Sequence, residues 1–130
     1  MSLLFIKNGY YVPIRIVNPI LGREYPENAN LLALVDTGFD GFLIIPEDIF
    51  SQLGLDILVS EEPFIRGICC KLRAKRAPIR LIFSEFDFVI DGDCLTFSGS
   101  REVIIGLDAL SEIEMRIIGC KRSGEITRCL

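Results

Sequence analysis

One acidic tripeptide is the clearest candidate for chemistry in this sequence. Asp36-Thr37-Gly38 follows an apolar run over residues 31–35 and precedes a second apolar run over residues 42–45. Runs of this kind predict strands that are buried on both faces. A carboxyl group at the end of such a strand is in surroundings that alter its protonation, and a glycine at the bend permits close approach of the backbone. We therefore predict a catalytic carboxylate at Asp36. The alternative is a turn that ends a strand without catalysis.

The types of residue that are missing narrow the chemistry further. The 130 residues include no histidine. This excludes a Ser-His-Asp or Cys-His nucleophile, a histidine general base and every zinc or iron site that contains histidine. Proton transfer near neutral or acidic pH therefore falls to carboxylates, cysteines, lysines or tyrosines. Glycine motifs for phosphates or dinucleotides are also missing, so we expect no cofactor.

The cysteines indicate thiols rather than a disulfide framework. Their number is odd and they form no C-x-x-C pair, which is typical of a reduced, cytoplasmic protein. They are Cys69, Cys70, Cys94, Cys120 and Cys129. Neighbouring residues of a strand point to opposite faces, so one of Cys69 and Cys70 is expected to be buried, and a thiol-dependent function of this pair is a weaker alternative. A bond between Cys120 and Cys129 would require antiparallel terminal strands.

Two charged segments have plain interpretations. Asp91-Gly92-Asp93 predicts a hairpin turn rather than a metal site, and we expect no bound metal. A basic segment places alternate cations on one face of a strand, and it predicts a solvated edge strand protected by charge. Its residues are Lys71, Arg73 and Lys75, joined by Arg76 and Arg80. The alternative is a basic rim that attracts acidic peptides or another polyanion.

Charge and hydropathy restrict the partners. The net charge of −4 and the pI of about 4.8 argue against nucleic acid, which requires a positive surface. Mean hydropathy is high at +0.42, yet the apolar runs are far too short for a membrane span. The first residues lack the basic segment of a signal peptide. We therefore expect no membrane partner and a cytoplasmic location, with the apolar surplus buried in a core or against another protein.

The elements that must position Asp36 are mostly short strands. Apolar residues make up 50% of the chain and charged residues 25%, which is typical of one folded domain over residues 1–130. Asn8-Gly9 predicts a hairpin between strands over residues 3–6 and 10–17. Further strands are expected over residues 31–35, 42–45, 57–60, 64–72, 79–83, 86–90, 94–97, 103–105, 115–118 and 126–129. Short helices are expected over residues 46–53 and 107–113, so the fold class is all-β.

Two segments together resemble one known family. Ala33-Leu34-Val35-Asp36-Thr37-Gly38 resembles the active-site strand and turn of the retropepsin-like, or retroviral-type, aspartic proteases of clan AA. Residues 103–110, Val-Ile-Ile-Gly-Leu-Asp-Ala-Leu, resemble the segment and helix that pack beside the catalytic loop in that family. The resemblance covers roughly residues 1–120 and is closest to the small microbial members. It implies a closed, mostly antiparallel barrel of the acid-protease type.

The same resemblance implies a mechanism and a partner. Two carboxylates that share one proton can activate a water and protonate a leaving amine, which a single carboxylate cannot do. Only one Asp-Thr-Gly occurs, so the second Asp36 must come from another copy in a two-fold homodimer. Thr37 would hydrogen-bond across the pair, and Gly38 would leave room for a peptide or protein substrate.

The chain departs from the retroviral pattern at two places. Phe39 stands where those enzymes usually have Ala or Ser, and its ring is expected to crowd or reshape the substrate groove. The hairpin that closes over substrate is expected over residues 64–69, with one glycine at its tip. The predicted substrate-binding residues are Phe39, Asp40, Gly41, Arg66, Gly67 and Ile68. A catalytically inactive dimeric module that binds peptides or proteins through the same groove is the alternative function.

Overall fold

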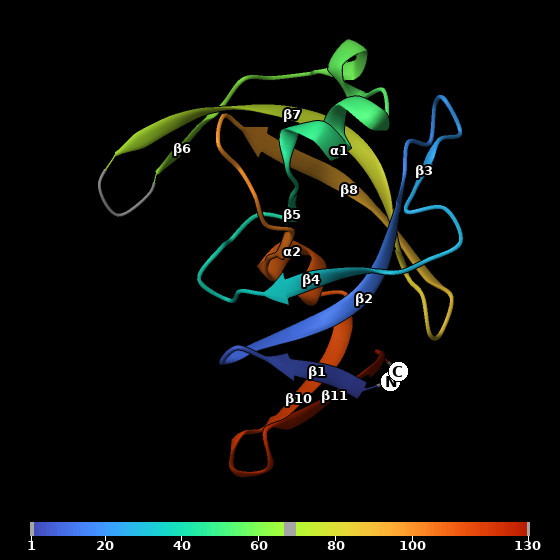
Figure 1. The fold of residues 1–130 in the computed structure, drawn as a ribbon, viewed down its shortest axis with the longest axis vertical. Helices are drawn as coiled ribbons and strands as arrows, with labels where there is room; N and C mark the ends of the chain where they lie inside the picture. Colours follow the sequence, from blue (N-terminus) through green and yellow to red (C-terminus); the bar gives the residue numbers. More distant parts are fainter. Residues whose placement is uncertain (1, 67–69, 130) are drawn as a thin grey trace.

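The structure is a computed structural model that describes residues 2–66 and 70–129, and it contains one mixed sheet with short helices (Figure 1). The strands are β1 (Ser2–Ile6), β2 (Gly9–Val17), β3 (Glu24–Tyr25), β4 (Leu31–Val35), β5 (Leu43–Ile44), β6 (Phe64–Arg66), β7 (Lys71–Phe83), β8 (Phe88–Phe97), β9 (Ile104–Ile105), β10 (Ile113–Ile118) and β11 (Ser123–Arg128). The helices are α1 (Glu47–Gln52), α2 (Leu107–Leu110) and the 3-10 turns η1 (Leu55–Leu58) and η2 (Gly119–Lys121).

Six of the strands form a closed ring. In the order β2, β4, β9, β5, β8 and β7 each strand pairs with the next, and β7 pairs back to β2. Among the strand pairs of the described residues, only β4–β9 and β5–β8 are parallel. Ile14, Leu43 and Phe83 are fully buried in the core. The predicted all-β, mostly antiparallel fold is confirmed.

The first hairpin forms where Asn-Gly predicts it. Lys7 and Asn8 have φ values of 47° and 65°, the left-handed pair that a two-residue hairpin turn requires. The following strand, β2, is central to the sheet, because it pairs with β1, β3, β4 and β7. Its side chains Val12, Ile14 and Ile16 are buried on one face of the strand, and Arg15 and Val17 on the other face are less buried, although Pro13 on that face is buried as well.

Helix α1 begins and ends close to its predicted bounds. Pro46 is the residue before the helix, and Glu47 and Asp48 lie in its first turn, where the positive end of the helix favours acidic side chains. Phe50 is buried against the core, and Gly54 follows in the left-handed conformation with φ of 73°. The helix lies beside β8 and connects the strand after the acidic loop to the rest of the sheet.

The turn predicted at Asp91-Gly92-Asp93 is wrong. These residues continue β8, and Asp91, Gly92 and Asp93 pair with Arg80, Ile79 and Pro78 of β7. A side-chain carbon at Gly92 would lie 2.6 Å from the ring of Phe42, so the glycine makes room for an aromatic ring from elsewhere in the chain. The hairpin instead turns after Phe83.

Two other predicted elements are of a different type in the structure. The strand expected over residues 57–60 is wrong, since Ile57 lies in η1 and is 76% exposed. The helix expected over residues 107–113 ends at Leu110, and Ile113 begins β10 instead. In both places the apolar stretch is too short for its periodicity to distinguish a strand from a helix.

The terminal strands test the bond suggested between Cys120 and Cys129. β10 and β11 are antiparallel neighbours, but their register pairs Ile113 with Arg128 and Ile118 with Ser123. Cys120 therefore lies at the turn of this hairpin and Cys129 lies beyond its open end, and both thiols are free. The suggested disulfide is wrong.

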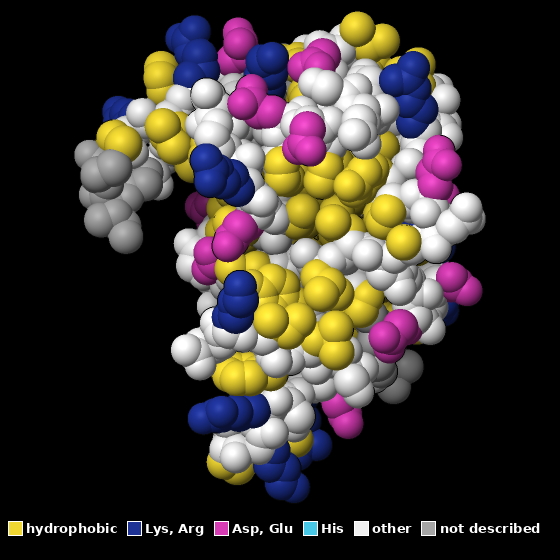
Figure 2. Space-filling view, in the orientation of Figure 1, with side chains coloured by type: hydrophobic (Ala, Val, Ile, Leu, Met, Phe, Trp, Pro, Cys, Tyr) yellow, Lys and Arg dark blue, Asp and Glu magenta, His cyan; other side chains and the backbone are white. Residues whose placement is uncertain are grey.

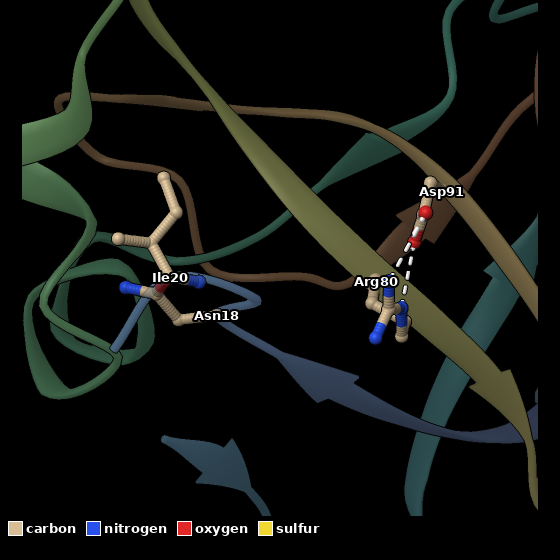
Figure 3. A network of polar contacts seen from close by, with 4 residues as sticks. All are labelled: Asn18, Ile20, Arg80 and Asp91. Carbon is tan, nitrogen blue, oxygen red and sulfur yellow. Dashed lines mark hydrogen bonds and ion pairs between the residues drawn. The ribbon is translucent and has the colours of Figure 1, made fainter. Parts of the chain in front are cut away.

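The basic segment lies in β7, and the predicted edge strand describes only part of it. Residues 71–73 pair with β6 alone, residues 74–83 pair with β8, and residues 80–83 pair with β2 as well. Several of its cations have acidic partners: Lys75 with Asp56, Arg76 with Glu61, and Arg80 with Asp91. Figure 3 shows the two-pronged contact of Arg80 with Asp91.

A buried asparagine fixes the loop after β2. The Asn18 side chain accepts hydrogen bonds from the backbone N–H groups of Ile20 and Leu21 and donates one to the carbonyl of Leu53. Figure 3 draws Asn18 beside Ile20. The loop is thereby tied to the end of α1. Every polar atom of this buried side chain has a partner, which removes the cost of burying it.

β4 is buried on one face only, which corrects the expectation of a fully buried strand. Ala33 is fully buried, whereas Leu32 is 38% exposed on the other face. Figure 2 shows apolar side chains gathered in the middle of the face that carries β4 in Figure 1. Within the described ranges, no helix has the length and apolar character that crossing a membrane requires.

Candidate active site

Asp36 lies directly after β4, where this strand runs parallel to β9. The pairing sets Val35 beside Ile105, and the N–H of Asp36 donates a hydrogen bond to the carbonyl of Ile105 at 3.0 Å. Asp36 is half-buried, whereas Thr37 and Gly38 are exposed. The carboxylate thus emerges from a well-paired strand end into an accessible loop.

The loop holds the carboxylate by its own backbone. Asp36 Oδ1 accepts a hydrogen bond from the N–H of Gly38 at 2.9 Å, and the carbonyl of Asp36 accepts one from the N–H of Phe39 at 3.2 Å. These two bonds fold residues 36–39 into a tight bend. One carboxylate oxygen is therefore oriented by the chain itself.

Backbone hydrogen bonds connect the start of α2 to the end of this loop. The N–H groups of Gly106, Leu107 and Asp108 donate hydrogen bonds to the carbonyls of Phe42, Phe39 and Gly41, at 3.1, 2.8 and 3.1 Å. Residue 106 has to be glycine, because a side-chain carbon there would lie 2.6 Å from the carbonyl oxygen of Phe39 and would clash with that of Gly41. The two segments that carried the family resemblance are therefore in direct contact.

A groove of about 490 Å³ lies between the loop and the β6–β7 hairpin. Gly38, Phe39, Asp40 and Gly41 line one side of it. The remaining lining residues come from the hairpin and β8: Pro63, Phe64, Ile65, Arg66, Arg76 and Leu95. In Figure 1 this hairpin projects on the same side of the molecule as the loop between β4 and β5. Of the three predicted catalytic residues, Gly38 is among the lining residues of the groove, whereas Asp36 and Thr37 are not.

The groove brings together most of the predicted substrate-binding residues. Phe39, Asp40, Gly41 and Arg66 line it. Gly67 and Ile68, together with Cys69, lie outside the described residues. β6 pairs antiparallel with the start of β7, so a hairpin exists where the closing hairpin is expected.

Sequence reasoning missed Pro63, Phe64, Ile65, Arg76 and Leu95 as lining residues. The basic segment carried a partial signal, since a basic rim was one of its two interpretations. Of its five cations, Arg76 alone is among the groove's lining residues, and it is also paired with Glu61 at 2.8 Å. Arg76 is at an even-numbered position of β7. The odd-numbered positions hold Lys71, Arg73 and Lys75, which therefore lie on the opposite face of the strand.

The ring of Phe39 is among the side chains that line the groove. A side-chain carbon at Gly41 or at Gly106 would lie 2.5 Å from this ring, so the ring rests against the backbone of both glycines. It packs with a small apolar cluster that includes Ile44 and Leu95. Phe39 is thereby part of the groove's floor.

Cys94 supplies no reactive thiol to this arrangement, and the described residues form no metal site. Cys94 is fully buried, and burial followed by the nearby charge of Asp93 raises the pKa of its thiol well above the ordinary value. Such a thiol is not a nucleophile near neutral pH. No group of three or more acidic or cysteine side chains in residues 2–66 and 70–129 is arranged to hold a metal ion.

Comparison with known proteins gives a sequence relative over almost the whole chain. A protein of Archaeoglobus fulgidus, described as an uncharacterized protein, is 31% identical over 127 residues, which cover 97% of this chain and 99% of that one. The chain belongs to the same family as this archaeal protein. No family model matches the sequence.

Two solved structures share the fold of this chain. A retropepsin-like aspartic protease from Rickettsia conorii matches 98% of this chain and 97% of its own, with a TM-score of 0.63 and 15% identity. The EIAV protease in complex with the inhibitor HBY-793 matches 83% of this chain and 90% of its own, with a TM-score of 0.58 and 15% identity. The resemblance drawn from residues 33–38 and 103–110 is confirmed, and the fold is that of the retropepsin-like aspartic proteases.

Proposed function

We propose that this protein is an aspartic peptide-bond hydrolase that acts as a homodimer, with Asp36 of each copy in one shared site. The observation that carries the proposal is the position of Asp36. It directly follows a strand fixed to β9, its carboxylate is oriented by Gly38, and its loop forms one side of a groove that the β6–β7 hairpin borders on the other. A groove of this kind suits an extended peptide, and a carboxylate beside it suits activation of water.

The chemistry requires two carboxylates in different protonation states. Like charges at close range do not both ionise easily, so a symmetric pair holds one proton. The ionised Asp36 takes a proton from water as the water oxygen attacks the scissile carbonyl carbon. The protonated Asp36 of the second copy donates its proton to the leaving nitrogen. Thr37 of each copy is proposed to hydrogen-bond to the other loop and keep the pair aligned.

The apolar surface supports a second copy as the source of the other carboxylate. Leu4 and Ile6 of β1 are 42% and 39% exposed, and Leu32 of β4 is also exposed. The register aligns Leu4 with Tyr11 and Tyr11 with Leu34, so these side chains share the outer face of β1, β2 and β4. Exposed apolar faces of this kind are typical of interaction surfaces. One domain over residues 1–130 and a cytoplasmic location complete the proposal.

Replacement of the carboxylate tests this function. Wild type is expected to cleave members of a mixed peptide library at about pH 4 to 5, and Asp36→Asn, which keeps the shape and removes the charge, is expected to abolish cleavage. Asp87→Asn is the matched control, because Asp87 lies in the exposed turn between β7 and β8 at a φ of 49° that asparagine readily adopts.

Sedimentation of the same samples tests the dimer. We expect wild type to sediment as a dimer at micromolar concentration and its specific activity to fall on dilution. Cleavage that survives Asp36→Asn would refute the mechanism, and a protein that stays monomeric with and without peptide would refute the shared site. Peptide binding without any cleavage by wild type would favour the inactive binding module.

A further inference from the structure

A recess of about 220 Å³ lies on the face of β7 and β8 opposite to the groove. Arg76 and Leu95, which are paired across the two strands, line the groove. Lys75 and Thr96, the next pair in the same register, line the recess. Neighbouring residues of a strand point to opposite faces, so the sheet separates the recess from the groove.

The lining of the recess carries charges of both signs. Arg73 and Lys75 of β7 line it, together with Glu62 from the segment before β6 and Glu47 from the first turn of α1. Figure 2 shows Lys or Arg and Asp or Glu side chains intermixed over the part of the molecule where Figure 1 places α1 and β7. A molecule in the recess therefore meets carboxylates and cations together.

Three of these four charges have no ion-pair partner in the part of the chain that the structure describes. Lys75 is paired with Asp56 of η1 at 3.4 Å, whereas neither glutamate has a cation within ion-pair distance. The Arg73 guanidinium lies 5.2 Å from the centre of the Phe64 ring. Contact with the face of a ring holds a guanidinium without using its N–H groups, which stay available to an anion.

A buried hydroxyl lies at the base of the recess. Thr96 is 2% exposed, and its Oγ1 has no hydrogen-bond partner among the described residues. Because Thr96 is paired with Lys75, the two side chains share the face of the sheet on which the recess lies. A buried hydroxyl without a partner is destabilising, and a polar ligand group that bonds to it removes this penalty. The hydroxyl therefore points to a ligand with a polar group.

From these contacts we propose that the recess binds a free α-amino acid with a neutral polar side chain. The Arg73 guanidinium binds the carboxylate of the amino acid, the two glutamates bind its ammonium group, and its side chain bonds to the hydroxyl of Thr96. The volume suits one amino acid and is too small for an extended peptide. The site does not depend on the proposed function, because the groove lies on the other face of the sheet.

Titration of isotope-labelled protein with L-glutamine, followed by NMR, tests the proposal. We expect the shifted amide signals to be concentrated in residues 73–75 and 96–98, which line or adjoin the recess. N-acetyl-L-glutamine lacks the ammonium group, L-glutaminamide lacks the carboxylate, and L-leucine lacks the polar side-chain group. Each is expected to bind about tenfold more weakly than L-glutamine, because each leaves one of the three partners unbonded.

Substitutions in the recess test each contact from the side of the protein. Thr96→Val removes the hydroxyl and keeps the shape, so we expect L-glutamine to bind about tenfold more weakly. Thermal stability should stay unchanged or rise, since the hydroxyl has no partner to lose. Arg73→Gln is expected to weaken binding by more than about tenfold, because it removes a charged partner. Arg116→Gln is the matched control, since Arg116 is an exposed arginine of β10 outside the recess.

The outcomes separate this inference from the proposed function. Equal binding of L-glutamine and its blocked derivatives, undiminished binding in folded Thr96→Val or Arg73→Gln, shifts scattered over the whole surface, or no binding would overturn it. Weakening confined to the recess variants supports it. Asp36→Asn protein is expected to bind L-glutamine as wild type does. A failure of peptide cleavage therefore leaves the amino-acid site intact, and a failure of amino-acid binding leaves the hydrolase proposal intact.

Discussion

Asp36 Oδ1 and the N–H of Gly38 are joined by a hydrogen bond of 2.9 Å within a single bend of the chain. The carboxylate is thus oriented by the residue two positions after it, before any second copy or substrate is bound. This contact also leaves little room around residue 38. A side-chain carbon there would lie 3.1 Å from Asp36 Oδ1, which is tighter than ordinary van der Waals contact.

Gly38→Ala is therefore expected to disturb activity more than stability. The added methyl group displaces the Asp36 carboxylate by a few tenths of an ångström, and misplacement of a reacting group is costly for catalysis. We expect kcat/KM for peptide cleavage to fall about tenfold or more, with the urea unfolding midpoint almost unchanged because the loop is exposed. Gly119→Ala is the control, since nothing lies within 4 Å of its added carbon. Unchanged kcat/KM in Gly38→Ala would contradict the importance of this contact.

Gly106→Ala is expected to disturb stability more than activity, the reverse of Gly38→Ala. Its added carbon meets the Phe39 carbonyl at 2.6 Å and also the Gly41 carbonyl, and backbone atoms cannot move aside as a flexible side chain does. We expect the free energy of unfolding to fall by about 2 to 3 kcal/mol, measured by urea denaturation. Gly119→Ala again serves as the control and should leave it unchanged. Near-native stability of Gly106→Ala would show that the loop and α2 separate easily.

Local sequence predicted the parts of the site whose signals lie close together. Asn8-Gly9, the apolar run before Asp36 and the Pro46 helix start each act through their immediate neighbours, and the structure has the corresponding turn, strand and helix. The contact between the two family motifs was predicted through the resemblance rather than through local pattern.

The wrong predictions concern places where a residue distant in the sequence determines the local structure. Asp91-Gly92-Asp93 has turn composition, yet Gly92 is required by the ring of Phe42, and the strand continues through it. Leu32 belongs to an apolar run but faces outward, because burial of a strand depends on what covers each face. Groove residues such as Arg76 and Leu95 become neighbours of the acidic loop only when the ring closes.

The continuation of β8 through Asp91 creates an ion pair whose pH dependence can be measured. Asp91 faces Arg80 across the strand pair, and the Arg80 guanidinium donates hydrogen bonds of 2.8 and 3.2 Å to its two oxygens. This hydrogen bonding holds the pKa of the Asp91 carboxyl below its ordinary value of 3.8. A carboxyl whose pKa is lower in the folded state stabilises the fold above its unfolded-state pKa, and it loses that effect as the pH falls through the folded-state value.

Asp91→Asn is therefore expected to be less stable than wild type at pH 7 by a small amount, because both side chains are exposed and screened by water. The difference should disappear as the pH is lowered through and below 3.8, where wild type also loses the charge. It should shrink at neutral pH in about 1 M salt, which screens exposed charges. Urea unfolding of wild type, Asp91→Asn and the turn control Asp87→Asn along this pH series measures it. A stability difference that persists at low pH would show that Asp91 acts through packing within β8 rather than through its charge.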